Sequence, residues 1–201
     1  MGKRTERSKK TYDQMAAGYD TSPEGNYTRP HKAELIKRVI FRDGDSVLDV
    51  ACGNGSLLGE LSKKASIHAF GVDLSENMVA VARERHPDCT FAVQPCVPLC
   101  FENESMHIIT VSCAFHHFED PRGFAGECMR VLKKNGMVYM AEPFFTPVIR
   151  WLANTVVFPF SKSGDVKVYS PRELSSFFEA AGFSDVETYT KGSVLFLSGR
   201  K

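Results

Sequence analysis

The residues best placed to do chemistry lie in one short loop. Asp49 is followed by Ala51-Cys52-Gly53-Asn54-Gly55. Gly53 and Gly55 lack side chains, so the backbone there can turn sharply and approach a ligand closely. A helix after the loop would point its N-terminal amides at that ligand, which suits a carboxylate, while Asp49 can attract a cation. An amino-acid group carries both charges, so the loop suits a ligand that contains one.

A second carboxylate, Asp73, lies 18 positions after Gly55 and ends a short apolar run. In that position it can accept hydrogen bonds from both hydroxyls of a ribose. Its alternative role is to cap the next helix, for which Ser75 competes. The nicotinamide-dinucleotide fingerprint needs a third glycine where Leu58 stands, and it has no use for Asp49. These residues favour an adenosine-type ligand over a nicotinamide dinucleotide.

The elements that must position these residues alternate between apolar runs and helical patterns. Because each run is nearly continuous, the pattern predicts a parallel sheet covered on both faces. The fold class is α/β: a doubly wound, Rossmann-like, seven-stranded sheet, mostly parallel with an antiparallel C-terminal hairpin strand. The predicted strands are Ser46–Val50, Ile67–Val72, Thr90–Val93, His107–Ser112, Met137–Ala141, Val186–Thr190 and Val194–Ser198.

Helices are predicted between the strands and at both ends of the sequence. The residues from Thr21 to Arg29 are predicted to be a loop, and Lys133-Lys134-Asn135-Gly136 is predicted to end a helix. Ser170-Pro171-Arg172-Glu173 has the pattern of a helix start. The predicted helices are Tyr12–Tyr19, Pro30–Ile40, Leu57–Lys64, Glu76–Arg85, Pro121–Leu132 and 171–181.

The 201 residues predict a single domain, 1–201. Within it we expect an N-terminal helical lid at 1–41, a cofactor-binding core at 42–142, a substrate cap insertion at 143–170, and a C-terminal helix and hairpin at 171–201.

Composition narrows the function classes. Charged residues make up 24% of the chain and the formal net charge is +1, which argues against disorder and against binding nucleic acid. The basic run from Lys3 to Lys10 is interpreted as a solvated tail, with a membrane-surface or RNA contact as the alternative. We expect a cytoplasmic protein with no signal peptide and no transmembrane segment. The six cysteines show no zinc-type spacing, so reduced thiols and no metal are expected.

Several longer motifs resemble those of class I S-adenosylmethionine-dependent methyltransferases. They are VLDVACGNGSLLGEL, GVDLSENMVAVAR, AFHHFEDP, CMRVLKKNGMVYMAEPF and YSPRELSSFFEAAGF. The early YDQMAAGYD resembles the entry segment of the ubiquinone/menaquinone-biosynthesis type of small-molecule methyltransferase. The resemblance spans about Tyr12 to Lys201, and its motifs are specific for the cofactor but not for an acceptor.

The resemblance implies S-adenosylmethionine as cofactor, S-adenosylhomocysteine as product, and a role for each matched residue. Asp49, Ala51, Gly53 and Gly55, with Cys52 and Asn54 between them, match the loop around the methionine moiety. Asp73 matches the ribose ligand, with Leu74 and Met78 beside ribose and adenine. Cys96 and Val97 match the adenine segment, and Cys113 and Ala114 match the strand end next to the sulfonium.

The chain departs from the family pattern at three positions. Ala51 stands where the family often has glycine, and we expect it to be tolerated with a negative φ. Pro95 replaces an aspartate that accepts the adenine amino hydrogen, which removes a hydrogen bond of about 1 kcal/mol. His107 replaces an acidic residue at the start of the fourth strand.

The acceptor side has weaker signals. His116 and His117 follow the fourth strand and are candidates for a base or an acceptor ligand, or for shaping the pocket wall. Tyr19 is the preferred lid residue and a third catalytic candidate, with a core aromatic as its alternative role. The aromatic residues within Phe144–Phe160 would line an apolar acceptor pocket or form a dimer interface, so the chain is expected to be a monomer or homodimer.

We therefore expect methyl transfer to a small apolar or aromatic acceptor. The alternative is a non-catalytic cofactor-binding or regulatory protein on the same fold. Nucleic-acid methylation is disfavoured, because Ser112-Cys113-Ala114-Phe115 stands where a base-methylating motif is expected.

Overall fold

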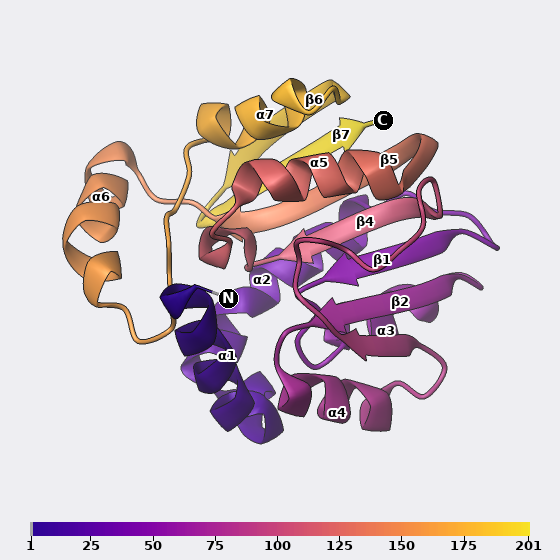
Figure 1. Ribbon diagram of the computed structural model, residues 1–201, viewed down its shortest axis with the longest axis horizontal. Helices are drawn as coiled ribbons and strands as arrows, with labels where there is room; N and C mark the ends of the chain where they lie inside the picture. Colours follow the sequence, from indigo (N-terminus) through magenta and orange to yellow (C-terminus); the bar gives the residue numbers. More distant parts are fainter. Residues whose placement is uncertain (1) are drawn as a thin grey trace.

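The computed structural model describes residues 2–201. Two helices and a 3-10 turn precede the first strand, and strands and helices then alternate (Figure 1). The N-terminal elements are α1 (Lys3–Met15), η1 (Ala16–Thr21) and α2 (Pro23–Arg38). The central ones are β1 (Ser46–Val50), α3 (Ser56–Ser62), β2 (His68–Asp73), α4 (Glu76–Arg85), β3 (Thr90–Val93), β4 (Met106–Ser112), η2 (Phe115–His117), α5 (Pro121–Val131) and β5 (Leu132–Pro143). The last are α6 (Pro147–Leu152), η3 (Ala153–Val157), η4 (Phe158–Phe160), α7 (Pro171–Ala180), β6 (Ser184–Lys191) and β7 (Val194–Arg200).

The seven strands form one sheet in the order β3-β2-β1-β4-β5-β7-β6. The pairs from β3 to β5 are parallel, whereas β7 runs antiparallel to both β5 and β6. The predicted fold class is confirmed, including the antiparallel hairpin strand. Because the chain reverses its winding at β1, the carboxyl ends of β1 and β4 meet at the switch point where ligands bind in such sheets.

Two hydrophobic cores lie on opposite faces of the sheet. Successive residues alternate between them: Leu48 packs on the face covered by α5 and α7, and Val47 packs on the face covered by α2, α3 and α4. The same alternation holds for Ile109 and Ile108 in β4. This period-two pattern fixes the strand register, because a slip by one residue would exchange the two faces.

The N-terminal region differs from the prediction. The basic run is not a tail but part of α1, and the predicted loop Thr21–Arg29 is mostly helix. Ser22 caps α2 by accepting a hydrogen bond from the Gly25 amide at 3.0 Å, and Pro23 occupies the first turn, where its missing N–H costs nothing. Pro30 lies inside α2 and does not open it. Both Pro23 and Pro30 could mark the start of this helix, and the sequence analysis chose Pro30, whereas the helix begins at Pro23.

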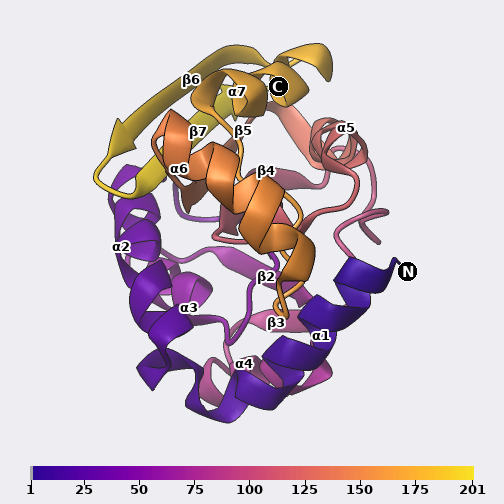
Figure 2. The same ribbon diagram turned by 90° about the vertical axis from the view of Figure 1, so that its left-hand side faces the viewer.

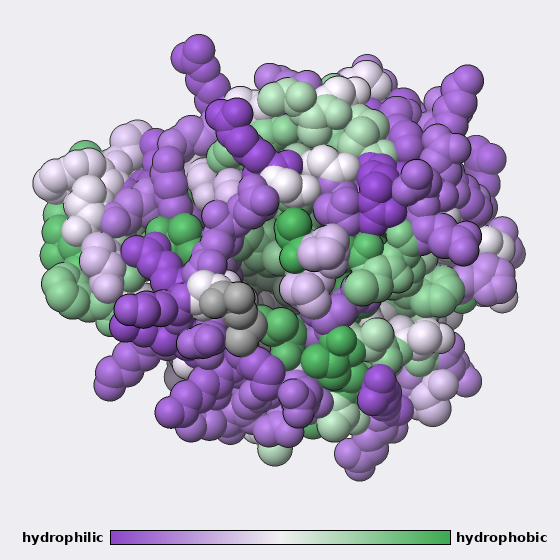
Figure 3. Space-filling model, viewed as in Figure 1, coloured by the Kyte–Doolittle hydropathy of each residue, from purple (hydrophilic) through white to green (hydrophobic). Residues whose placement is uncertain are grey.

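The segment after β5 projects from the body of the protein (Figures 1 and 2). It contains α6, η3 and η4, and its largest apolar side chains are exposed: Trp151 is 62% exposed and Phe160 is 82% exposed. Apolar surface lies over this segment at the left edge of Figure 3. Within residues 2–201, no helix has the length and apolar character needed to cross a membrane.

Candidate active site

A cavity of about 950 Å³, counting the part open to solvent, lies at the carboxyl ends of β1, β2 and β4. Helix α1 lies across this edge of the sheet (Figure 2) and contributes Thr5, Ser8 and Tyr12 to the cavity wall. The floor consists of strand ends and the loops that follow them. The predicted residues that line the cavity are Tyr19, Ala51, Cys52, Gly53, Asp73, Leu74, Met78, Cys96, Cys113, Ala114 and His117.

The loop after β1 turns through three residues in the left-handed region. Ala51, Gly53 and Gly55 have φ values of 57°, 53° and 74°. The expectation of a negative φ at Ala51 is wrong, so its Cβ is strained where glycine would not be. A Cβ on Gly53 would make only an ordinary contact with Met78 Sδ at 3.9 Å, whereas a Cβ on Gly55 would come within 2.7 Å of the Phe91 ring. Gly55 therefore allows the start of α3 to pack against β3 and α4, and Gly53 lines the cavity.

Asp73 fixes the shape of this loop. Its Oδ2 accepts a hydrogen bond from the Gly53 amide at 2.8 Å, and its Oδ1 accepts one from the Ser75 amide at 2.8 Å. Burial raises the pKa of the carboxyl, and the backbone hydrogen bonds act against that rise. Ser75 caps α4 as predicted, since its Oγ accepts from the Met78 amide at 3.1 Å. Asp73 thus faces the cavity with its orientation fixed by main-chain donors.

Asp49 lies beneath the loop and does not reach the cavity wall. Its Oδ1 accepts a hydrogen bond from Thr110 Oγ1 at 2.7 Å, and burial raises its pKa to about 7. A cation that does face the cavity is Lys32 of α2, whose Nζ donates to Ser56 Oγ at 2.6 Å. Burial lowers the pKa of Lys32, and Asp49 acts against this. The sequence analysis missed Lys32, because it lies outside the recognisable motifs.

Asn54 also turns away from the cavity. It is fully buried, and its Nδ2 donates to Asp20 Oδ1 at 2.8 Å. Asp20 in turn pairs with Arg85 of α4. This chain of contacts ties the N-terminal region to the glycine loop, so Asn54 positions the lid and does not contact a ligand in the cavity.

The far wall is formed by Gln94, Pro95 and Cys96 together with Leu74 and Met78. Val97 is absent from this wall and packs against the α5 and α7 core. His107 lies at the opposite end of β4, where its Nδ1 accepts a hydrogen bond from the Ser46 amide at 2.9 Å. His107 therefore joins two strands and takes no part in the site.

Helix α1 is held at both ends. Glu119 Oε1 accepts hydrogen bonds from the amides of Arg4 and Thr5 at 3.2 and 3.3 Å. These contacts pair two amides of the first turn and place a negative charge at the positive end of the helix dipole. Near the other end, Asp13 Oδ1 accepts from Ser75 Oγ at 2.6 Å. The helix is therefore fastened to both sides of the cavity that it covers.

The end of the cavity beside β4 carries a tyrosine–histidine pair. Tyr12 Oη lies 3.2 Å from His117 Nε2, and the two rings meet nearly edge to face at 83°. Burial, together with the neighbouring His116, lowers the pKa of His117, and burial raises that of Tyr12. Tyr19 also lines the cavity, and burial raises its pKa to about 12. His116 points elsewhere, with its Nδ1 2.8 Å from Glu142 Oε2.

The expected apolar acceptor pocket is not formed by the aromatic residues of the 143–170 segment. None of the five large aromatics within Phe144–Phe160 lines the cavity, and Trp151 and Phe160 are exposed. The five are Phe144, Phe145, Trp151, Phe158 and Phe160. The expectation of reduced thiols agrees with the structure, since all six cysteines in the described chain are free.

Comparison with known proteins identifies the family to which this chain belongs. The model of the methyltransferase domain family matches residues 48–140. Demethylmenaquinone methyltransferase of Chlorobaculum parvum is 28% identical to this chain, over 87% of this chain and 80% of the relative. The demethylmenaquinone methyltransferase of Thermotoga maritima is 31% identical, over 70% of this chain and 63% of the relative. The chain belongs to the class I S-adenosylmethionine-dependent methyltransferases.

Solved structures agree on the fold. A Haemonchus contortus phosphoethanolamine N-methyltransferase, crystallised with S-adenosylmethionine, superposes with a TM-score of 0.80 over all of this chain and 60% of its own, at 17% identity. A methyltransferase from the Haloferax volcanii complex with the activator Trm112 superposes with a TM-score of 0.79 over 94% of this chain and 96% of its own, at 23% identity.

The cofactor of this methyltransferase is S-adenosylmethionine, and the cavity matches its chemistry. The cavity holds a cation, Lys32, that complements a carboxylate. It also holds an oriented carboxylate, Asp73, and the apolar pair Leu74 and Met78.

Proposed function

We propose that this methyltransferase transfers the methyl group to a small hydroxylated ring, of the quinol type. The observation that supports it best is the Tyr12–His117 pair at the β4 end of an otherwise largely apolar cavity. The similarity to demethylmenaquinone methyltransferases supports the same acceptor class. A ring hydroxyl is the group that such a polar pair would recognise.

We assign the cofactor residues from their place in the cavity. Lys32, which faces the cavity beside the Ala51–Gly53 loop, holds the methionine carboxylate, and Asp73 accepts hydrogen bonds from the ribose hydroxyls. Leu74 and Met78 pack against ribose and adenine, and the Gln94–Cys96 wall encloses the adenine. In this assignment Asp49 acts on the cofactor only through Lys32.

When bound, S-adenosylmethionine supplies a methyl group already activated on a sulfonium. The chain therefore has to exclude water and align the acceptor, and such alignment is worth about 7–11 kcal/mol. Helix α1 excludes water by covering the cavity, and Cys113 and Ala114 form the wall beside the methyl group. Tyr12, held by His117, hydrogen-bonds the acceptor hydroxyl and so directs the neighbouring ring carbon toward the methyl group. As the new carbon–carbon bond forms, the carbon–sulfur bond of the cofactor breaks, S-adenosylhomocysteine leaves, and the ring carbon releases its proton to solvent.

In this proposal the 143–170 segment bounds the acceptor end through its last residues and not through its aromatics. Residues 161–168 pack against α1 and η2, because the amides of Val166 and Lys167 donate to the His116 carbonyl at 2.8 and 3.1 Å. Thr11 Oγ1 donates to the Lys162 carbonyl at 3.0 Å.

The test is a transfer assay with isotopically labelled cofactor and a demethylmenaquinol analogue, read by mass spectrometry. We expect a product heavier by one labelled methyl group on a ring carbon. A Tyr12→Phe variant should lower kcat about tenfold and leave the S-adenosylhomocysteine Kd unchanged. Tyr27→Phe is the matched control, since Tyr27 does not line the cavity.

Titration calorimetry with S-adenosylhomocysteine separates the two parts of the proposal. Absence of binding at millimolar ligand would refute the cofactor assignment. Tight binding without transfer to any quinol analogue would refute the acceptor class alone.

A further inference from the structure

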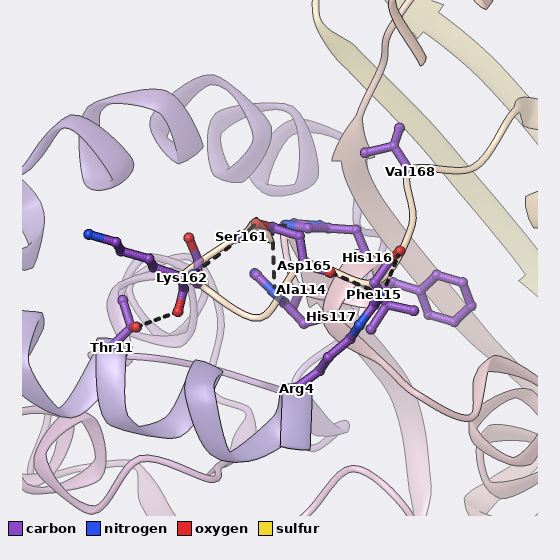
Figure 4. A network of polar contacts seen from close by, with 12 residues as sticks. Arg4, Thr11, Ala114, Phe115, His116, His117, Ser161, Lys162, Asp165 and Val168 are labelled. Atoms are coloured by element: carbon purple, nitrogen blue, oxygen red, sulfur yellow. Dashed lines mark hydrogen bonds and ion pairs between the residues drawn. The ribbon is translucent and has the colours of Figure 1, made fainter. Parts of the chain in front are cut away.

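A second group of chemically active side chains lies between η2 and the 161–168 segment. His116 and His117 come from η2, and Asp165 comes from the loop before α7 (Figure 4). One ligand atom from each residue lies within 4.8 Å of the other two. His116 Nε2 and His117 Nδ1 both lie 3.6 Å from Asp165 Oδ1. Two adjacent histidines and an aspartate 48 positions after the second of them thus converge on one point.

These separations are too long for hydrogen bonds and suit a bound ion. An N–H···O bond is normally 2.7–3.2 Å, so neither imidazole is bonded to the carboxylate. His117 Nδ1 is buried and has no hydrogen-bond partner within residues 2–201. Two ligands bound to one tetrahedral zinc ion, each at about 2.0–2.2 Å from it, lie roughly 3.3–3.6 Å apart. The two nitrogen–oxygen separations of 3.6 Å fall at the upper end of that range.

The surrounding contacts orient each ligand atom toward the same point. Glu142 Oε2 lies 2.8 Å from His116 Nδ1 and accepts a hydrogen bond from its N–H, so Nε2 carries the lone pair that faces Asp165. Glu142 is itself fixed, since its Oε1 accepts from the amides of Ala114 and Phe115 at 2.8 and 3.0 Å. A carboxylate behind a ligating histidine is the usual arrangement at zinc sites.

The other two ligands are oriented in the same way. Tyr12 Oη contacts His117 Nε2, and the other ring nitrogen, Nδ1, therefore faces the cluster. Ser161 Oγ donates a hydrogen bond to Asp165 Oδ2, and the other carboxylate oxygen, Oδ1, faces both histidines. The guanidinium of Arg4 is bonded to the main-chain carbonyls of Asp165 and Val166 at 3.3 and 3.1 Å and not to the carboxylate. Within residues 2–201, no lysine or arginine side chain pairs with the Asp165 carboxylate.

We propose that His116 Nε2, His117 Nδ1 and Asp165 Oδ1 form a binding site for a divalent zinc ion. Two imidazoles and one carboxylate leave a fourth tetrahedral position for water or for an oxygen of a bound molecule. The expectation of no metal rested on cysteine spacing, which carries no information about a site built from adjacent histidines and a distant aspartate. The proposal does not depend on the identity of the methyl acceptor.

The test is binding of the metal alone to protein stripped with a chelator. Titration calorimetry with Zn²⁺ should give one equivalent with a Kd of about 1 μM or tighter. Co²⁺ in the same site should show the intense visible absorption of tetrahedral coordination. Asp165→Asn and His117→Gln should each weaken zinc binding at least tenfold, and Glu142→Gln should weaken it by a smaller factor.

Matched controls keep the result clear. His68 is exposed and lies at the start of β2, so His68→Gln should bind zinc as tightly as the wild type. Circular dichroism and S-adenosylhomocysteine binding, measured without metal, verify that Asp165→Asn is folded. The proposal would be overturned if zinc bound without a defined stoichiometry. A zinc Kd of about 100 μM or weaker, 100-fold above the expected value, would also overturn it. Equal zinc affinity of Asp165→Asn and wild type, or binding of Mn²⁺ in place of Zn²⁺, would also overturn it.

Discussion

The two ends of the cavity are built in different ways. At the cofactor end, Asp73 and the glycine loop lie on strand ends of a buried sheet, and main-chain hydrogen bonds fix them. At the acceptor end, Tyr12, His117 and Asp165 come from three segments that meet only in the folded chain. The first end is a local consequence of the sequence, and the second depends on long-range docking of α1 and the 161–168 segment.

The largest effect is expected at the cofactor end. Asp73→Asn keeps the side-chain size but replaces the charge that accepts from Gly53 and Ser75, so S-adenosylhomocysteine should bind at least about 30-fold more weakly. Calorimetry would measure this. Asp88→Asn, at an exposed carboxylate, is the control. Unchanged affinity in Asp73→Asn would mean that the main-chain loop alone defines the cofactor end.

The next effect tests the docking of the acceptor end. Gly164 has φ +76°, and a Cβ there would lie 2.3 Å from the Arg4 carbonyl oxygen. Gly164→Ala should therefore separate α1 from the 161–168 segment, at a cost of roughly 1–3 kcal/mol. Limited trypsin digestion within α1 should accelerate.

Gly126→Ala is the matched control for this variant, since a Cβ on Gly126 meets nothing within 4 Å. If both variants are digested at the wild-type rate, α1 does not depend on this contact.

A pH effect concerns the helix that carries Lys32. Glu34 of α2 accepts hydrogen bonds from Tyr189 and Arg38, which hold its pKa at about 2, below the ordinary 4.5. A lowered pKa in the folded state gives stability that is complete above pH 4.5 and lost as the pH falls toward 2. Glu34→Gln should cost about 2 kcal/mol at pH 7, and the difference from wild type should shrink below pH 4.

Urea unfolding at several pH values would measure this difference. Glu187→Gln, on the exposed side of β6, should change stability by less than about 0.5 kcal/mol throughout. A pH-independent difference for Glu34→Gln would exclude the charge as its origin.

A smaller effect tests strain in the glycine loop. Ala51→Gly removes a Cβ from a left-handed residue, and the gain of about 1–2 kcal/mol outweighs the entropy cost of glycine. The melting temperature should rise by about 2 °C. Ala80→Gly, in the exposed face of α4, should lower it instead. A lower melting temperature for Ala51→Gly would contradict the left-handed conformation.

The smallest effect is expected in the projecting segment. Trp151→Ser and Phe160→Ser remove exposed rings and should each change the free energy of unfolding by less than about 0.5 kcal/mol. Phe115→Ala, in the buried core, should cost about 3–5 kcal/mol in the same urea titration. A large loss from Trp151→Ser would show that the segment packs against the body.

The same contrast explains what could be predicted from the sequence. The sheet and the Asp73 position follow from apolar runs and local motifs, because strand ends in a parallel sheet meet at one edge. Lys32 and Asp165 could not be found in this way, because their roles depend on contacts with residues far away in the chain. The backbone of Ala51 was also unpredictable, since the φ of a single residue is set by the surrounding hydrogen bonds.

The two attachments of α1 have a kinetic consequence. Glu119 holds its first turn and Asp13 holds its last, so neither end can leave the cavity without breaking the contacts that order the whole helix. Ligand exchange then proceeds no faster than α1 opens as a unit. Deuterium exchange of the α1 amides should accordingly give one common free energy of opening, and the rate of that opening sets an upper limit on turnover.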